Sequence, residues 1–448
     1  MSSKKLASRR KFLKDTTVVA AGTALAAGLN LGLVRSVHAQ GDDVIKIALI
    51  GCGGRGTGAA VNCLEAAKAL GQPVKLVAVA DAFKESTVAA LNEIKKEWSA
   101  NVDVPDERVF VGLNAYQKAI DCDIDMVLMA TPPGFRPLHY QAAIKAGKHV
   151  FMEKPCCVDA PGYRSLIETN KLADEKGLKV GVGLQRRHKK SYVSTIADIH
   201  DGKYGDLVLL QAYWNGGPIW WRDPIGDMSE MQKQVRNWYH FCWLSGDNIC
   251  EQHIHNLDVC NWAKNAHPVE ANGMGCDQMR RAERGQSQLF DHHFVEFTYP
   301  DGYRMYSQCR QVVGCFSLVS EYAIGNKGPD RIELGGNVSK RDVKDTHGLE
   351  FKFGEMQQEH CALLNAIRRD LPYNEGKHGA TSSMTAVLGR MATYSGKVVK
   401  WDEAVEKGKC EAPGLETYTW DTAPPVVPDG KGVYPSATPG IYDDPYVA

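Results

Sequence analysis

A short apolar strand followed by a glycine-rich turn constrains the fold of this chain more than any other feature. Residues 45–50 read IKIALI, and a GxGxxG pattern follows directly: Gly51, Cys52, Gly53, Gly54, Arg55 and Gly56. The first glycine of such a pattern makes a tight turn, the second lets the backbone approach a pyrophosphate, and the third lets a helix pack on the strand. Because glycine-rich turns are common, the pattern predicts a dinucleotide site only if its context agrees.

The second predicted strand supplies that context. Residues 75–80 read KLVAVA, and Asp81 follows at the carboxyl end of the strand. A carboxylate at this point binds both hydroxyls of a ribose and repels a 2′-phosphate, so the sequence favours NAD over NADP. Lys84 weakens that preference slightly because its charge is close by.

Apolar runs and helical stretches continue to alternate along the first half of the chain. Short apolar runs occupy residues 125–130, 148–153 and 178–183, with helical patterns between them. This rhythm is typical of βαβ units and a parallel sheet. We therefore expect an α/β fold with a Rossmann dinucleotide-binding domain over residues 43–184.

The second half has a different character. After about Gln185 the chain is rich in aromatic residues and then in strands, including a predicted hairpin over 294–311 that turns at Pro300–Gly302. We assign residues 185–410 to a second α/β domain and expect a late helix to pack back on the first. Residues 411–448 are rich in Pro and Gly and are expected to extend over a surface of this chain or of a neighbour.

The N-terminus resembles a twin-arginine export signal. Residues 8–14 read SRRKFLK, an Ala/Gly-rich apolar run spans 16–34, and residues 37–39 offer small residues at a cleavage position. This order predicts a signal peptide over 1–39 and a periplasmic or otherwise exported protein. The alternative is a membrane anchor, but the run is shorter than the roughly 20 apolar residues that a span needs. We expect no stable membrane insertion after cleavage.

The charge balance argues against nucleic acid as a partner. The whole chain has 53 basic and 53 acidic residues, and residues 1–39 hold seven of the basic ones and one of the acidic ones. The chain that remains after cleavage has a formal charge of −6, whereas binding a phosphate backbone needs a basic surface.

Two further motifs stand at predicted strand ends. Thr131-Pro132-Pro133 follows the run at 125–130, and Glu153-Lys154-Pro155 ends the run at 148–153. Ligands of parallel sheets bind at the carboxyl edge of the strands. A lysine in that place, beside a dinucleotide, is favoured as a catalytic residue over a surface residue.

The order of these motifs resembles the glucose-fructose oxidoreductase, inositol dehydrogenase and MocA family (Gfo/Idh/MocA). The shared features are the GxGxxG turn, the strand-end Asp81, ATP followed by His139, and GKHVFMEKP with Lys154. The resemblance covers essentially the whole chain after the leader. It implies an NAD(P)-dependent oxidoreductase that acts on sugars or cyclitols at a carbinol carbon.

The resemblance also implies an architecture and a set of cofactor contacts. The second domain is expected to have a large, mostly antiparallel open sheet, through which a homo-oligomer (a dimer or tetramer) would form. The lysine is expected near nicotinamide and substrate. Cofactor contacts besides the glycine loop, Arg55 and Asp81 are expected from Thr131, Pro132, His139, Glu153 and Lys154.

Residues 251–258 read EQHIHNLD and hold several groups that can bind metal or carry protons. The family has a helical motif of Asp, His four residues later and Asp three residues after that. Glu251, His255 and Asp258 match its spacing, with Glu in place of the first Asp. On a helix, about 100° per residue places these three on one face and His253 roughly 200° from Glu251. On a strand the two histidines could share a metal ion, but the family match favours the helix, so we expect no metal.

The chemistry that these residues imply is hydride transfer. Histidine titrates near working pH without perturbation, so His255 is the expected general base. Lys154 would donate a hydrogen bond to the developing alkoxide and help to relay the proton. Glu251 would orient or polarise one of these two groups.

Aromatic and cationic side chains are the expected substrate contacts. Five of the nine tryptophans lie between residues 213 and 243, and aromatic rings stack on the apolar faces of sugars. The family commonly has an arginine at the segment after the last Rossmann strand. The expected substrate-binding residues are Arg186, Trp238, Tyr239 and His255.

Export would restrict how the cofactor is used, because there is no free NAD pool outside the cytoplasm. The cofactor would have to stay tightly bound and be regenerated by a second sugar or an outside electron acceptor. An NAD-dependent glycoside hydrolase with transient C3 oxidation is an alternative, and a non-catalytic sugar- or NAD-binding protein is another. Lys154 favours an oxidoreductase over the hydrolase, and Lys154 with His255 favours an enzyme over the non-catalytic protein.

Overall fold

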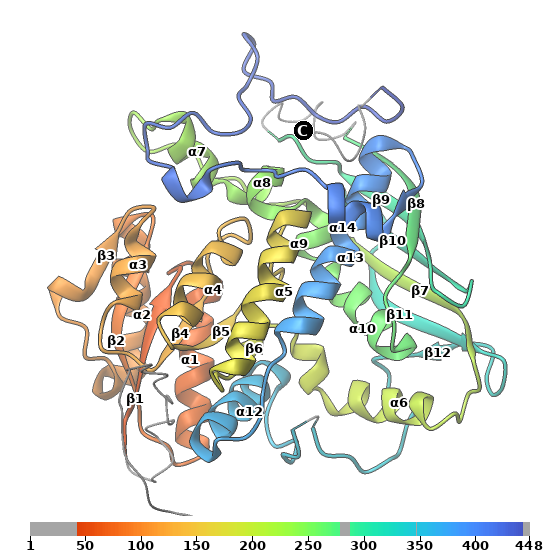
Figure 1. The fold of residues 1–448 in the computed structure, drawn as a ribbon, viewed down its shortest axis with the longest axis horizontal. Coiled ribbons are helices and arrows are strands. Elements are labelled where there is room, and N and C mark those ends of the chain that lie inside the picture. The colour runs from red at the N-terminus through yellow and green to blue at the C-terminus, as the bar shows by residue number, and fades with distance from the viewer. Residues whose placement is uncertain (1–42, 278–286, 346, 442–448) are drawn as a thin grey trace, which may run out of the picture. The chain divides into compact units, whose positions relative to one another are not determined.

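Two sheets with different strand directions organise the chain (Figure 1). The computed structural model describes residues 43–277, 287–345 and 347–441. The predicted signal peptide at 1–39 lies outside these residues. Within them, no helix combines the length and the apolar character that a membrane span requires.

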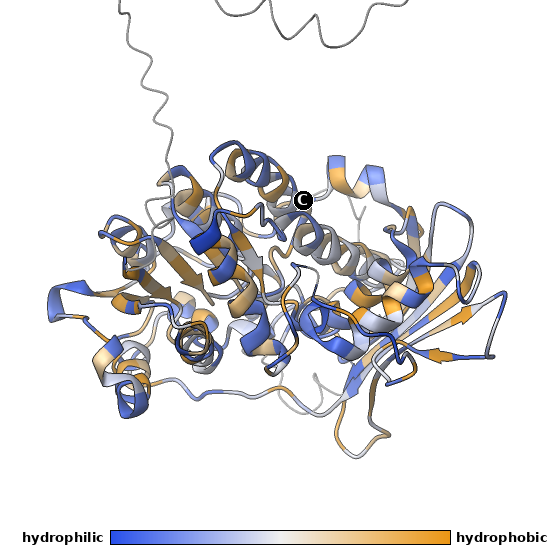
Figure 2. Cartoon of the chain, turned by 90° about the horizontal axis from the view of Figure 1, so that it is seen from below, coloured by the Kyte–Doolittle hydropathy of each residue, from blue (hydrophilic) through white to orange (hydrophobic). Residues whose placement is uncertain are grey.

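The first sheet is parallel, in the order β3-β2-β1-β4-β5-β6. Its strands are β1 (Ile45–Ile50), β2 (Val74–Asp81), β3 (Val109–Val111), β4 (Met126–Met129), β5 (His149–Met152) and β6 (Val180–Val182). The central strands are buried along almost their whole length, and Figure 2 shows them as predominantly hydrophobic. A parallel sheet covered on both faces requires such strands. The strand order is that of a Rossmann domain, so this part of the predicted α/β fold is confirmed.

The helices on this sheet come from both halves of the chain. The connecting helices are α1 (Gly54–Ala69), α2 (Lys84–Trp98), α3 (Ala115–Ile120), α4 (Arg136–Lys145) and α5 (Ala160–Glu175), with short 3-10 turns η1 (Ser99–Asn101) and η2 (Asp106–Arg108). A late helix, α12 (Glu355–Arg369), packs against α1 and buries Leu363 and Ile367 in the same core as strands β1 and β4. The chain therefore returns to its first domain after the second sheet.

The second sheet has the order β12-β11-β7-β10-β9-β8-β13, and every neighbouring pair is antiparallel except β7 and β10. Its strands are β7 (Leu207–Gly216), β8 (Glu270–Cys276), β9 (His292–Thr298), β10 (Arg304–Gln311), β11 (Leu318–Gly325), β12 (Ile332–Glu333) and β13 (Val399–Lys400). The predicted hairpin is confirmed, because β9 and β10 pair on either side of Pro300–Gly302.

Helices cover one face of this sheet. They are α6 (Lys190–His200), which follows the 3-10 turn η3 (Gln185–His188), α10 (Ile254–Lys264) and α13 (Gly376–Ser395). The opposite face presents Met274, Phe294 and Tyr306, which are 36–69 % exposed. The predicted open, mostly antiparallel sheet is thus confirmed.

Short elements and the tail complete the fold. Between β7 and α10 lie α7 (Glu230–Arg236), η4 (Trp238–His240), α8 (Cys242–Ser245) and α9 (Asn248–Glu251). The tail follows α14 (Trp401–Lys407), contains η5 (Leu415–Thr417) and runs past α7 and α8 in Figure 1. Its Tyr418 and Tyr434 are buried in an apolar cluster with Phe241 and Trp243, so the tail belongs to the core of its own chain.

Candidate active site

The glycine loop between β1 and α1 has the shape that a dinucleotide requires. Gly51 has a φ of 96°, and a Cβ on Gly56 would lie 1.8 Å from the carbonyl oxygen of Gly51. Only glycine therefore allows this turn and this approach of helix to strand. A Cβ on Gly53, in contrast, would meet nothing within 4 Å. Gly53 is the N-cap of α1 and lines an open pocket, so a ligand there can reach the free N–H groups of the helix.

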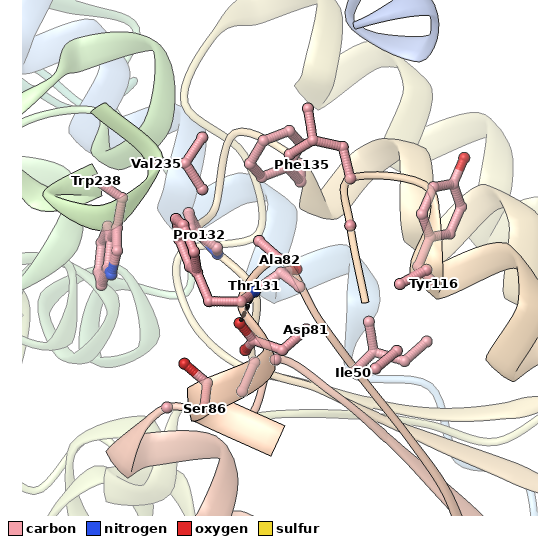
Figure 3. Close-up of a pocket in the computed structure, with 18 of the residues that line it drawn as sticks. Ile50, Asp81, Ala82, Ser86, Tyr116, Thr131, Pro132, Phe135, Val235 and Trp238 are labelled. Atoms are coloured by element: carbon pink, nitrogen blue, oxygen red, sulfur yellow. Dashed lines mark hydrogen bonds between the residues drawn. The ribbon is translucent and has the colours of Figure 1, made fainter. Parts of the chain in front are cut away.

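Asp81 lies in the same pocket, at the carboxyl end of β2 (Figure 3). Its carboxylate accepts hydrogen bonds from the backbone N–H groups of Cys52 at 2.7 Å and Phe83 at 2.9 Å. Burial raises the pKa of Asp81, and these two hydrogen bonds oppose that shift. Each carboxylate oxygen keeps another lone pair, so Asp81 can still accept the hydroxyls of a ribose.

His139, Thr131 and Pro132 line the pocket as well. The ring centroid of His139 is 3.9 Å from that of Tyr116 and 5.8 Å from that of Phe135, and its Nδ1 is 3.3 Å from Oγ1 of Thr131. Burial lowers the pKa of His139 to about 3. The ring is therefore neutral near pH 7 and forms an uncharged part of the pocket wall. Together with the glycine loop, these residues fit an NAD-type cofactor.

Arg55 and Glu153 are bound to each other. Nε of Arg55 lies 2.5 Å from Oε1 of Glu153, and Nη2 lies 3.6 Å from a carboxylate oxygen of Glu359 on α12. Burial, and then the charge of Glu153, raise the pKa of Glu359 well above its ordinary value. Glu153 therefore balances the charge of Arg55. Both residues hold the glycine loop to the carboxyl end of β5, with β4 between β5 and β1, and Glu359 joins them from the late helix α12.

Lys154 meets Glu251 just beyond β5. Its Nζ lies 2.9 Å from Oε1 of Glu251 and also donates a hydrogen bond to the main-chain carbonyl of Glu251. His255 is buried beside this pair. Burial, followed by the charges of Lys154 and Arg186, lowers the pKa of His255 well below its usual value. The imidazole is therefore neutral at working pH and can accept a hydrogen bond. It is also a weaker base than the unperturbed histidine expected from the sequence.

Two polar atoms of this group have no partner among the described residues. They are Oε2 of Glu251 and Nδ1 of His255, and both are buried. Buried polar atoms in folded proteins nearly always have partners. An alcohol hydroxyl, which both donates and accepts a hydrogen bond, has the chemistry to satisfy such atoms.

The EQHIHNLD segment is two helices rather than the single helix predicted. Helix α9 ends at Glu251, and α10 begins at Ile254 with His253 as its N-cap. The backbone N–H of His255 donates to the carbonyl of Gln252 at 3.3 Å. The carbonyl of Glu251 is thereby left for Lys154, which a continuous helix would not have allowed because the N–H of His255 would occupy it.

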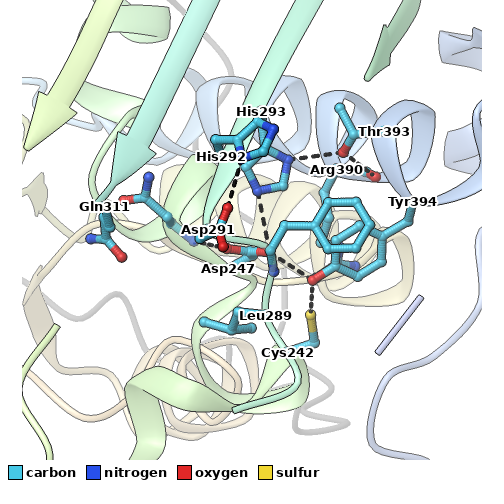
Figure 4. A network of polar contacts seen from close by, with 12 residues as sticks. Cys242, Asp247, Leu289, Asp291, His292, His293, Gln311, Arg390, Thr393 and Tyr394 are labelled. Atoms are coloured by element: carbon cyan, nitrogen blue, oxygen red, sulfur yellow. Dashed lines mark hydrogen bonds and ion pairs between the residues drawn. The ribbon is translucent and has the colours of Figure 1, made fainter. Parts of the chain in front are cut away.

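A buried polar network fixes α9 (Figure 4). Asp247 is the N-cap of this helix and has a φ of 77°. Its Oδ2 accepts hydrogen bonds from Tyr394 Oη at 2.6 Å and from the N–H of Phe290 at 3.1 Å, and it lies 3.3 Å from Nε2 of His293. Partners from β9 and α13 thus hold the left-handed residue that starts the short helix and places Glu251.

Arg186 and Trp214 form the adjoining wall. The Trp214 ring stacks on the His255 imidazole with centroids 6.0 Å apart, and the Arg186 guanidinium is 6.0 Å from the Trp214 ring. Arg186 is paired with the buried Glu321, which also accepts a hydrogen bond from Tyr192 at 3.0 Å. Trp214 belongs to the tryptophan-rich stretch at 213–243 but is not among the residues that the sequence predicted at the substrate. Its alternation on β7, toward the covered face of the sheet, is the signal that distinguishes it.

The remaining polar residues of the motif serve the fold. Nε2 of His253 is 2.7 Å from the hydroxyl of Ser307 on β10, and burial lowers the pKa of His253 to about 3. Asp258 accepts two hydrogen bonds from Arg187 at 2.8 and 2.7 Å. Among the described residues, one group has the spacing for a metal ion, and it lies on β8–β9 outside this motif: Cys276, Asp291 and His292.

Trp238 and Tyr239, expected at the substrate, lie elsewhere. Trp238 lines the dinucleotide pocket with Asp81, opposite Pro132 (Figure 3). Tyr239 is 3 % exposed and accepts a hydrogen bond from Gln311 at 3.0 Å. Tyr239 is therefore a core residue, and Trp214 is the aromatic ring that stacks on His255. The cause is the 3-10 turn η4, which turns adjacent residues to different environments.

Comparison with known proteins agrees with this geometry. Residues 45–184 match the Gfo/Idh/MocA family model, described as an oxidoreductase family with an NAD-binding Rossmann fold. The chain is 34% identical over 113 residues to scyllo-inositol 2-dehydrogenase (NADP(+)) IolW of Bacillus subtilis, covering 25% of this chain and 30% of that protein. It is 32% identical over 189 residues to inositol 2-dehydrogenase/D-chiro-inositol 3-dehydrogenase of Halalkalibacterium halodurans, covering 42% and 44%. The chain thus spans less than half the length of these curated relatives.

Solved structures share the whole fold. Scyllo-inositol dehydrogenase of Lactobacillus casei with bound NAD(H) and scyllo-inositol superposes with a TM-score of 0.57 at 22% identity, covering 80% of this chain and 100% of that one. Levoglucosan dehydrogenase in complex with NADH and levoglucosan gives 0.59 at 13% identity, covering 80% and 99%. Both of the domains described above therefore belong to one established architecture.

Proposed function

We propose that this chain is an NAD(H)-dependent oxidoreductase that acts on a hydroxyl-bearing carbon of a sugar or cyclitol. The observation that carries the proposal is the group of Lys154, Glu251 and His255, which stands one strand away from the dinucleotide pocket and holds two unpartnered polar atoms. The names of the relatives support the same class of substrate.

The roles of the residues follow from their contacts. A bound nicotinamide would accept the hydride of the substrate C–H bond. Neutral His255 takes the hydroxyl proton through Nδ1, a buried atom with no partner among the described residues, in the tautomer that carries its own proton on Nε2. The Lys154 ammonium donates a hydrogen bond to the oxygen on which negative charge develops, and Glu251 holds the ammonium in place. The apolar face of a sugar ring can stack on Trp214.

Further parts of the proposal concern the cofactor, the location and the assembly. NAD is favoured over NADP by the Asp81 carboxylate, although one relative is NADP-dependent by name. Residues 8–14 favour twin-arginine export, which calls for a cofactor that stays bound. The open sheet face of Met274, Phe294 and Tyr306 supports a homo-oligomer, which light scattering would measure.

The test begins with the purified protein as it is. Denaturation should release NAD(H), seen by absorbance, and added inositols or aldoses should then reduce the bound cofactor in a single turnover. Release of an aglycone from glycosides without accumulation of reduced nicotinamide would favour a glycoside hydrolase. Binding of sugar with neither reaction would show a non-catalytic protein and overturn the proposal.

A further inference from the structure

Two segments far from the glycine loop in sequence lie at the wall of the dinucleotide pocket: one lines the pocket and the other packs against its lining residues. One is residues 217–245 and the other is the tail, residues 408–441; we call them together the roof. The first segment contributes Arg222, Arg236 and Trp238 to the pocket wall. Figure 3 shows Trp238 on the side of the pocket facing Pro132. We propose that the roof is a second binding surface for the adenosine half of the cofactor and limits its release, an inference that rests on the proposed function.

The first segment is attached directly to the Rossmann domain. The N–H of Gly134 donates to the carbonyl of Leu244 at 2.9 Å, and a Cβ on Gly134 would lie 2.0 Å from the carbonyl oxygen of Trp243. Nη1 of Arg236 lies 3.2 Å from Oε1 of Glu85 on α2. Backbone contact on one side of the pocket and an ion pair on the other hold this segment down.

The tail reinforces that attachment. The ring of Trp420 lies 5.6 Å from that of Phe83, a residue of the pocket wall. Ser229 Oγ donates to the carbonyl of Trp420 at 2.9 Å, and Nε2 of Gln234 donates to the carbonyl of Val426 at 2.7 Å. The tail is thus bound both to the Rossmann domain and to helix α7 of the first segment.

The roof presents the chemistry that an adenosine diphosphate group needs. Arg236 uses two of its five N–H donors, one toward Glu85 and one from Nε to the carbonyl of Asp223 at 3.1 Å. The Arg222 guanidinium stands 4.5 Å from the Trp220 ring. Asn237 fixes the backbone of Arg222 through two hydrogen bonds of 2.8 Å. Guanidinium groups stack on purine rings and pair with phosphates.

Release of the cofactor would have to separate surfaces that are packed together. The apolar cluster under the roof joins tail residues with residues of the pocket wall: Phe135, Val235, Trp238, Phe83, Tyr418 and Trp420. Opening it exposes aromatic surface to water, which opposes release. The same cluster lies away from Lys154, so it should govern how long the cofactor stays and leave hydride transfer unchanged.

The test measures cofactor release rather than turnover. The full-length protein is loaded with NADH, and the loss of bound-NADH fluorescence is followed after an excess of NAD is added. Trp420→Ala and Arg236→Ala should each raise the dissociation rate at least tenfold and lower the amount of cofactor that copurifies. Lys431→Ala, an exposed position of the tail, is the matched control and should leave the rate within twofold of wild type.

The outcomes separate this inference from the function on which it rests. If the wild-type protein binds no dinucleotide, the proposed function fails. If the wild type binds NADH and both roof variants release it at the wild-type rate while remaining folded by circular dichroism, the roof does not hold the cofactor. A change in sugar KM without a change in NADH release would likewise overturn the inference, because the roof would then serve the substrate.

Discussion

The carboxylate of the dinucleotide pocket and the buried groups around Lys154 differ in how far their polar atoms are already paired. In the pocket, Asp81 already accepts two backbone hydrogen bonds. Among the described residues that line it, Nε2 of His139 is the one buried side-chain polar atom without a partner. In the Lys154 group, Oε2 of Glu251 and Nδ1 of His255 are buried and have no partner in the described part of the chain. In the first arrangement the backbone holds the carboxylate in place before a ligand arrives, which suits binding. The second is completed only by a ligand and suits chemistry, since groups that stabilise a transition state must be free to meet it.

Removing the Lys154 ammonium should impair catalysis and leave cofactor binding intact. Lys154→Ala is expected to lower kcat by about 10³-fold, because a charged donor to a developing alkoxide is lost, while NADH affinity changes little. Single-turnover reduction of bound NAD and fluorescence titration with NADH measure the two effects. Lys148→Ala, at the other end of β5 where Nζ donates to the carbonyl of Ile124, should affect neither. A comparable loss of NADH affinity in the Lys154 variant would show that the two regions are not separate.

Removing the Asp81 carboxylate should weaken cofactor binding and leave catalysis intact. Asp81→Ala is expected to weaken NAD binding about 10–100-fold, because roughly two hydrogen bonds to the ribose, each with a net value of about 1 kcal/mol, are lost, with little change in kcat at saturating NAD. The preference for NAD over NADP should shrink, because the repulsion of a 2′-phosphate is gone. Calorimetry with both cofactors measures this, with Glu93→Ala on the exposed side of α2 as control. An unchanged NAD affinity would mean that Asp81 serves only the loop that it already holds.

The two regions also differ in how far the sequence predicts them. The glycine loop follows from local sterics, since a left-handed φ at Gly51 and a close approach at Gly56 leave no other residue type. Alternation of apolar runs predicts the parallel sheet in the same way. These features depend on neighbours in sequence, so the Rossmann fold and the place of Asp81 at a strand end could be predicted.

Features that depend on long-range contacts could not be predicted from the sequence. The start of α9 depends on Asp247, whose unusual backbone is held by Tyr394 and His293 from distant elements. Glu359 reaches Arg55 only because α12 returns to the first domain. The tail resembles a surface extension by composition, yet Tyr418 and Tyr434 are buried. In each case a tertiary contact overrides the local pattern, and no spacing in the sequence records it.

A smaller effect, the pH dependence of stability, should also distinguish the dinucleotide pocket from the Lys154 group. Each region has a buried histidine with a pKa of about 3: His139 in the pocket and His253 under the Lys154 group. Because the unfolded chain binds protons on these rings at about pH 6.5 and the folded chain does not, stability is full above that pH and declines as pH falls toward 3. At pH 5.5 each of these histidines should lower the free energy of unfolding by about 1.4 kcal/mol.

His139→Gln and His253→Gln should each reduce the difference in unfolding free energy between pH 7.5 and pH 5.5 by that amount, measured by urea denaturation. His200→Gln, at an exposed ring, is the control and should leave the difference unchanged. Saturating NADH should reduce the loss of unfolding free energy at low pH more for His139 than for His253, because the bound cofactor covers only the pocket. Equal protection in the two variants would mean that cofactor binding stabilises the whole structure. The difference between the dinucleotide pocket, whose carboxylate is already held, and the Lys154 group, which a ligand completes, would then apply only to the protein without cofactor.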